Sequence, residues 1–177
     1  ISIIKLDLLF NLVWFLCFFF FFFMSSFGSF SCSGDDNGGL YVFHSTGNGL
    51  GASVYCMLVS GTNAITNEWL QWQNVTSGSN GLSGHYSGIG DQDGITISWV
   101  GNGPEGGASN IYARRFNASD GAISWNGNTK VITAADGNQE RFFWKKKENT
   151  YYYVWADDRP GVVGNSAIYA QKMTKNG

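Results

Sequence analysis

The sequence predicts an all-β protein built from about three copies of a four-stranded unit, and three observations lead to that prediction. Two aromatic-marked phrases recur at a steady spacing, and no window beyond Gly39 keeps the period of a helix. Clusters of Gly, Asn and Asp separate short apolar runs. Gly (24 residues) is abundant and Pro (2 residues) is rare, which is typical of short strands joined by tight turns.

The repeat is defined by an aromatic residue that closes one strand-like run and by a tyrosine in the next run. Successive markers of the first kind are 56 residues apart, and those of the second kind are 57 apart: Phe43, Trp99 and Trp155, then Tyr55, Tyr112 and Tyr169. A register this constant through differing residues indicates copies of one unit. We expect units at about 40–96, 97–152 and 153–177, the last one truncated.

Each unit contains four strand-like runs separated by turn residues. In the second unit these are 95–100, 110–117, 130–133 and 141–145. Alternation in the second run places Tyr112 and Phe116 on one face and Ile111 and Ala113 on the other, so both faces are apolar. Sheets covered on both faces, with four strands per unit, predict the blades of a β-propeller.

About three blades form an incomplete propeller, because closed rings typically have about four to eight. We therefore expect this chain to be the N-terminal fragment of a longer protein with further blades. Assembly of several copies is the alternative.

The N-terminal segment has the parts of a secretory signal. Lys5 precedes an apolar run over 8–24 with six consecutive Phe, and small polar residues follow. Small residues at 29 and 31, or at 26 and 28, suit a signal peptidase. We expect residues 1–32 to be a signal peptide or a helical membrane anchor, because the run is just long enough to span a bilayer at about 1.5 Å per residue. Residues 33–39 read as a polar linker.

Two other interpretations of this segment remain open. Cys32 would be lipid-modified if the weak motif before it served as a lipobox. Alternatively, the Phe run is translated non-coding sequence, and Met24 is the true start.

Charge and cysteine content narrow the function classes. The net charge is −2 with both signs thinly spread, which argues against a nucleic-acid surface. The one basic run, 145–147 beside Arg141, is expected to be a solvated strand end or hairpin. Three cysteines give no disulfide framework. Cys56 aligns with Ala113 and Ala170 and is expected to fill a small buried position.

The C-terminal segment resembles a repeat of secreted bacterial β-propeller proteins. The resemblance rests on Val-Trp-Ala-Asp-Asp-Arg at 154–159, Ile-Tyr-Ala-Gln-Lys at 168–172 and Asn-Gly at 176–177. It covers the chain from Gly39 onward and implies an exported or cell-surface protein, but it implies no particular activity. The Asp-x-Arg element is missing from the first and second units, so any role it has is not shared by every blade.

Two groups of residues are candidates for ligand binding. Asp157, Asp158 and Arg159 would form a charge cluster at a blade edge, although Asp-x-Arg is more often a local ion pair. Trp125, like Trp69 and Trp72, would stack on a sugar ring, with core packing as the more common use of such a residue.

Metal and catalytic motifs are weak. Asp91 and Asp93 precede Gly94 as in calcium loops, but Ile95, Ile97 and Trp99 supply no side-chain oxygen, so a plain turn is favoured over a Ca²⁺ site. His44 and His85 lack metal-ligand spacing with the cysteines. No nucleophile elbow, P-loop or paired-carboxylate motif is present, and we expect no cofactor and no catalytic residue in this chain.

These observations favour an exported binding or scaffold module for carbohydrate or protein, argued mainly from the predicted fold. The alternative is a fragment of a secreted propeller-type glycan hydrolase whose catalytic loops lie outside this chain. A third possibility is a display stalk held at the membrane by an uncleaved N-terminal segment.

Overall fold

The computed structural model describes residues 29–46, 52–59, 72–76, 81–102, 108–127, 129–133, 135–159 and 167–177. These residues form three antiparallel sheets, and the strand order within each sheet follows the chain. The only helical element among them is a single 3-10 turn, Trp125–Gly127. The prediction of an all-β protein is therefore confirmed.

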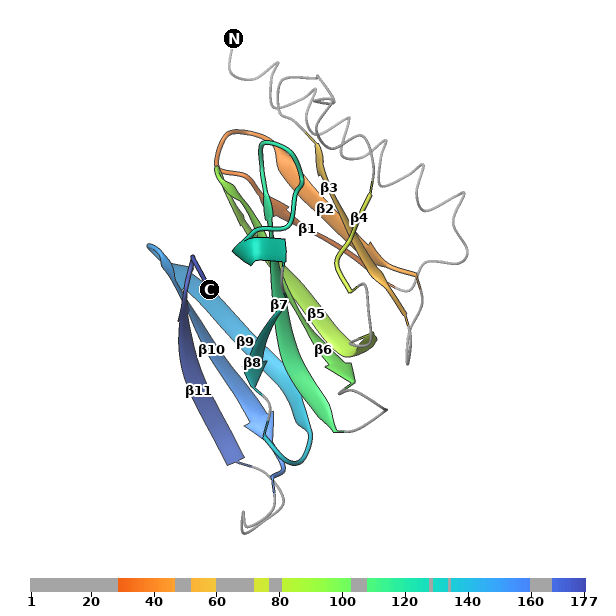
Figure 1. Ribbon diagram of the computed structural model, residues 1–177, viewed down its shortest axis with the longest axis vertical. Coiled ribbons are helices and arrows are strands. Elements are labelled where there is room, and N and C mark those ends of the chain that lie inside the picture. Colours follow the sequence, from red (N-terminus) through yellow and green to blue (C-terminus); the bar gives the residue numbers. More distant parts are fainter. Residues whose placement is uncertain are drawn as a thin grey trace.

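The three sheets lie side by side along the chain (Figure 1). The first contains β1 (Phe30–Gly34), β2 (Leu40–Ser45), β3 (Val54–Val59) and β4 (Gln73–Asn74). The second contains β5 (Leu82–Asp91), β6 (Gly94–Asn102), β7 (Ser109–Asn117) and β8 (Lys130–Thr133). The third contains β9 (Gln139–Lys147), β10 (Thr150–Asp157) and β11 (Ala167–Thr174).

Each sheet begins one strand earlier in the chain than the corresponding repeat unit predicted from the sequence. All four runs expected in the second unit are strands, but the fourth, β9, belongs to the third sheet. The first strand of the second sheet, β5, has the sequence LSGHYSGIGD and lacks the β-branched and aromatic density of a typical strand. It is held in place by pairing with β6 along most of its length and by its neighbours.

Glycines allow β5 to lie between β1 and β9, both of which it contacts. A Cβ on Gly90 would lie 2.3 Å from the Gly34 carbonyl oxygen and 2.5 Å from the Tyr41 ring. A Cβ on Gly88 would lie 2.8 Å from the Phe43 ring. Larger residues at either position would push the first and second sheets apart, so the glycine content of β5 has a packing cause.

Strand β7 divides two hydrophobic cores. Tyr112 and Phe116 lie in the core between the first and second sheets. Ile111 and Ala113 lie in the core between the second and third sheets. The predicted apolar character of both faces is confirmed, because each face of this strand is covered by a neighbouring sheet.

A stacked pair of rings joins the second and third strands of every sheet. Trp99 lies opposite Tyr112 with ring centroids 5.8 Å apart, and Trp155 lies opposite Tyr169 at 6.2 Å. In the first sheet the partner of Tyr55 is His44, at 5.6 Å. The tyrosine markers thus occupy matching positions.

The aromatic marker Phe43 does not match Trp99 and Trp155. Phe43 lies opposite Cys56 and packs into the core toward the second sheet, where its ring meets Tyr86. Trp99 and Trp155 instead face the preceding sheet. A shift of one residue reverses the face of a strand side chain. The structural counterpart of Trp99 and Trp155 is therefore His44, one residue after Phe43.

The N-terminal boundary also differs from the expected linker. Residues 30–34 form β1, in which Cys32 lies opposite Val42, and only 35–39 form a turn. Asp35 Oδ1 accepts hydrogen bonds from the N–H groups of Asn37 (2.8 Å) and Gly39 (2.6 Å), which closes that turn. The apolar run over 8–24 lies outside the described residues. Within the described part of the chain, no helix is long and apolar enough to cross a membrane.

Candidate functional site

The predicted calcium motif is a hairpin turn between β5 and β6. Asp91 lies opposite Gly94, and Asp91 Oδ1 accepts a hydrogen bond from the Asp93 N–H at 3.0 Å. Gly94 has a φ of 152°, and a Cβ there would lie 2.0 Å from the Phe116 carbonyl oxygen. The glycine is therefore required by the close approach of β7 rather than by a metal.

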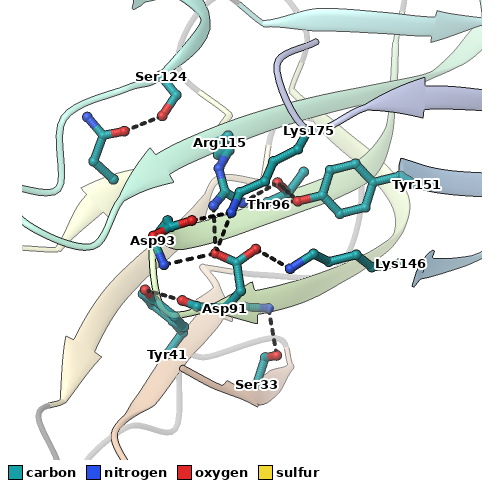
Figure 2. Close-up of polar contacts among 12 residues, drawn as sticks. Ser33, Tyr41, Asp91, Asp93, Thr96, Arg115, Ser124, Lys146, Tyr151 and Lys175 are labelled. Atoms are coloured by element: carbon teal, nitrogen blue, oxygen red, sulfur yellow. Dashed lines mark hydrogen bonds and ion pairs between the residues drawn. The ribbon is translucent and has the colours of Figure 1, made fainter. Parts of the chain in front are cut away.

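Three cations converge on the Asp91 carboxylate (Figure 2). Arg115 Nη2 on β7 lies 2.7 Å from Oδ1, and Lys146 Nζ on β9 bonds to Oδ2. Lys175, just beyond β11, lies 3.3 Å from Asp91 Oδ1 and 2.5 Å from Asp93 Oδ2. We call these five residues the Asp91 cluster. Its cations come from both the second and the third sheet.

The environment of Asp91 keeps it ionised. Its side chain is only 4% exposed, and burial alone would raise its pKa. The hydrogen bonds from Lys146 and Arg115 outweigh burial and hold the pKa of Asp91 well below its usual value. A Ca²⁺ ion at this carboxylate would have to displace these cations. Within the described ranges, no group of three or more His, Cys, Asp or Glu residues is placed to hold a metal.

Buried hydroxyls extend the Asp91 cluster across the sheet interfaces. Arg115 Nη1 donates to Thr96 Oγ1 at 3.2 Å and to Tyr151 Oη at 3.0 Å. Thr96 and Tyr151 hydroxyls are 2.7 Å apart, joining β6 to β10. The Tyr41 hydroxyl donates to the Asp91 carbonyl at 3.2 Å, which adds the first sheet. These hydrogen bonds therefore connect all three sheets.

The basic run over 145–147 is only partly solvated. Lys145 and Lys147 are exposed, whereas Lys146 points to the opposite face and pairs with Asp91. The expectation of a wholly solvated strand end was therefore wrong for Lys146. Alternation along β9 could have indicated this inward position, but the sequence did not identify its partner, 55 residues away.

Asp157 and Arg159 form a local ion pair. The buried Asp157 carboxylate accepts from Arg159 N at 2.9 Å, from Arg159 Nε at 3.0 Å and from Trp155 Nε1 at 3.1 Å. Hydrogen bonding from Arg159 lowers the pKa of Asp157 to about 2. The Arg159 guanidinium also lies 3.9 Å from the centre of the Tyr169 ring. These groups are therefore engaged with their own sheet.

The other binding candidates are also engaged in packing. Asp158 Oδ2 accepts from Asn138 Nδ2 at 3.2 Å. Trp125 packs against the core between the second and third sheets, and its Nε1–H donates to the Lys175 carbonyl at 2.9 Å. The Trp72 ring lies edge-on to His44, with centroids 4.6 Å apart. Trp69 lies outside the described residues.

A pocket of about 380 Å³ lies between the second and third sheets, near the strand ends remote from Asp91. Asn102 and Ser109 contribute to it from the second sheet, and Glu140 and Arg141 contribute from β9. Sequence reasoning did not single out this pocket. The positive φ of Arg141 (51°), which helps to form it, has no signal in the sequence.

No family model matches the chain, and no curated protein matches its sequence.

Proposed function

We propose that the chain is a segment of an exported or cell-surface β-propeller and acts as a binding or scaffold module for carbohydrate or protein. The observation that carries the proposal is the arrangement of the first strands. β1, β5 and β9 are the first strands of the three sheets, and β5 contacts both β1 and β9. In each sheet the later strands follow in chain order from this first strand. Blades of a propeller are arranged around an axis in this way.

The bare face of the third sheet supports the presence of a further blade. Large apolar side chains are exposed there: Phe143, Tyr152, Val154 and Ile168. Thr96 and Ser98, which precede Tyr152 and Val154 by 56 residues, are fully buried in the second sheet and bond to Tyr151 and Tyr153 of the third. In a propeller the next blade covers the corresponding face.

The two acidic candidates are engaged by cations and do not themselves support a hydrolase. Asp91 is surrounded by three cations, and Asp157 is held by Arg159 and Trp155. Both pKa values are lowered, so neither carboxyl is suited to act as the acid of glycoside hydrolysis. A module that presents loops and grooves on a rigid scaffold is the simpler function.

A paired binding and turnover assay tests this proposal. The purified protein is passed over immobilised glycans and over surface proteins of the source cell, and the same glycans are followed for product release. We expect saturable retention with no product. Product release that a single Asp or Glu substitution abolishes would instead establish a hydrolase, and retention of neither class would refute the binding module.

A further inference from the structure

The pocket between the second and third sheets owes its shape to a bulge in β9. Phe143 lies opposite Val154, but Glu140 lies opposite Ala156, so Arg141 and Phe142 together face Trp155. Arg141 adopts a φ of 51°, a left-handed conformation that an arginine rarely adopts. Bulges of this kind redirect side chains and are frequent beside functional sites.

The bulge places two consecutive charged residues in the same pocket. In a regular strand, Glu140 and Arg141 would point to opposite faces. Here both line the pocket, together with Asn102 from the end of β6. Among the described residues, no hydrogen bond or ion pair engages the side chains of these three residues, so their polar groups remain available to a ligand.

Hydrogen bonds and packing hold several residues around these groups. Asn138 Oδ1 accepts from the Ser109 N–H at 3.2 Å, while Asn138 Nδ2 donates to Asp158. Val100, which is buried, forms part of the apolar floor. His85 lines the pocket and packs on Phe142 with ring centroids 5.1 Å apart. Contacts that hold the lining residues in place lower the entropic cost of binding.

The chemistry of the free groups indicates the class of ligand. A guanidinium offers paired donors, a carboxylate offers paired acceptors, and an amide offers both. The charges of Glu140 and Arg141 cancel, so the pocket does not favour a strongly charged ligand. The adjacent hydroxyls of a sugar ring can both donate and accept hydrogen bonds. The C–H groups on the faces of such a ring can contact Val100 and His85. The volume also lies within the range of small-molecule sites, about 300–1,000 Å³.

We propose that this pocket binds one ring of a neutral saccharide through Glu140, Arg141 and Asn102. The inference rests on the proposed function as a binding module and specifies its ligand and its site.

Titration of the full chain with neutral oligosaccharides, followed by calorimetry, tests the proposal. The probes are β-glucan, xylan, mannan and chitin oligomers, with an oligogalacturonate as the acidic comparison. We expect a neutral probe to bind and Glu140→Ala or Arg141→Gly to weaken it at least about tenfold. Glycine accepts a φ of 51° without strain, so Arg141→Gly retains the bulge. Lys145→Ala, on the outer face of the same strand, is the matched control and should bind as the unchanged protein does.

The possible results separate this inference from the proposed function. Binding of a neutral probe that neither pocket variant weakens would overturn the pocket while leaving the binding module intact. Binding of the acidic probe alone, or of a protein ligand without any saccharide, would also overturn the neutral-saccharide site. Circular dichroism melting of each variant shows whether lost binding reflects lost folding, and if both variants unfold, Glu140→Gln should reduce affinity in the same direction and its unchanged affinity would count against the site.

Discussion

Lys146 on β9 bonds to Asp91 at the end of β5, so the first strands of two neighbouring sheets are joined by an ion pair (Figure 2). Arg115, which lies on the second sheet, pairs with the same Asp91 carboxylate, and its side chain is as buried as that of Asp91. The Asp91 cluster is therefore a buried polar connection between the second and third sheets.

Replacing Asp91 with Asn should therefore destabilise the fold strongly. The change leaves the buried Arg115 without its counter-charge, and breaking one side of a buried ion pair costs about 3–5 kcal/mol. Urea unfolding followed by tryptophan fluorescence measures the loss. Asp93→Asn is the matched control, because that side chain is 62% exposed and its pair with Lys175 is worth less than about 1 kcal/mol. Equal losses of stability for the two substitutions would contradict a stabilising role of the buried Asp91–Arg115 ion pair.

Stability should fall in acid because of Asp157 and Asp91. The pKa of Asp157 is about 2 in the folded protein, below the value of about 3.9 for an unperturbed Asp. A lowered folded-state pKa contributes stability above the unfolded value, and this contribution is lost as the pH falls from about 4 through about 2. Urea midpoints between pH 7 and pH 2 measure the effect. Asp157→Asn should be less stable at pH 7 and should show a shallower decline, whereas an unchanged slope would contradict the assignment.

Gly90→Ala should separate the first two sheets. The added Cβ would lie 2.3 Å from the Gly34 carbonyl oxygen, which cannot move without shifting β1. We expect a loss of more than about 1 kcal/mol, measured by thermal unfolding. Gly34→Ala offers a control, since no heavy atom would lie within 4 Å of its Cβ. Similar melting temperatures for Gly90→Ala and the unchanged protein would argue against the close contact of β5 with β1.

The fold extends further toward the N-terminus than the sequence suggested, and under the proposed export this would limit where a signal peptide is cleaved. Ser29 N–H donates to Ser45 Oγ at 3.1 Å, and Ser45 N–H donates to the Ser29 carbonyl at 2.9 Å. Cleavage after Ser31 would remove these bonds and part of β1. We predict that an exported, cleaved form begins at Ser29. N-terminal sequencing of protein from the culture medium checks this, and a mature chain that starts at Cys32 would contradict it.

Local alternation predicted the strands well, while contacts between sheets could not be predicted. The two faces of β7 followed from its period of two, since Tyr112 and Ile111 are neighbours with different partners. The glycine-rich β5 carried no strand signal because its stability comes from pairing with β6. The partners of Asp91 depend on how whole sheets pack, which no local pattern encodes.

The candidate binding residues show the same limit. The sequence correctly offered a local ion pair as one interpretation of Asp157 and Arg159, because two residues in one extended segment lie on the same side. The pocket depends instead on a backbone irregularity at Arg141 and on strand ends that meet from two sheets. Neither has a residue pattern of its own.

The bare face of the third sheet also affects how the chain behaves in solution. Tyr152, flanked across the strands by Lys145 and Lys172, lies among apolar neighbours but beside positive charges. Such lysines repel a second copy of the same face and thereby oppose self-association. Salt screens these charges, so a higher salt concentration should weaken the repulsion and favour association of copies through this surface.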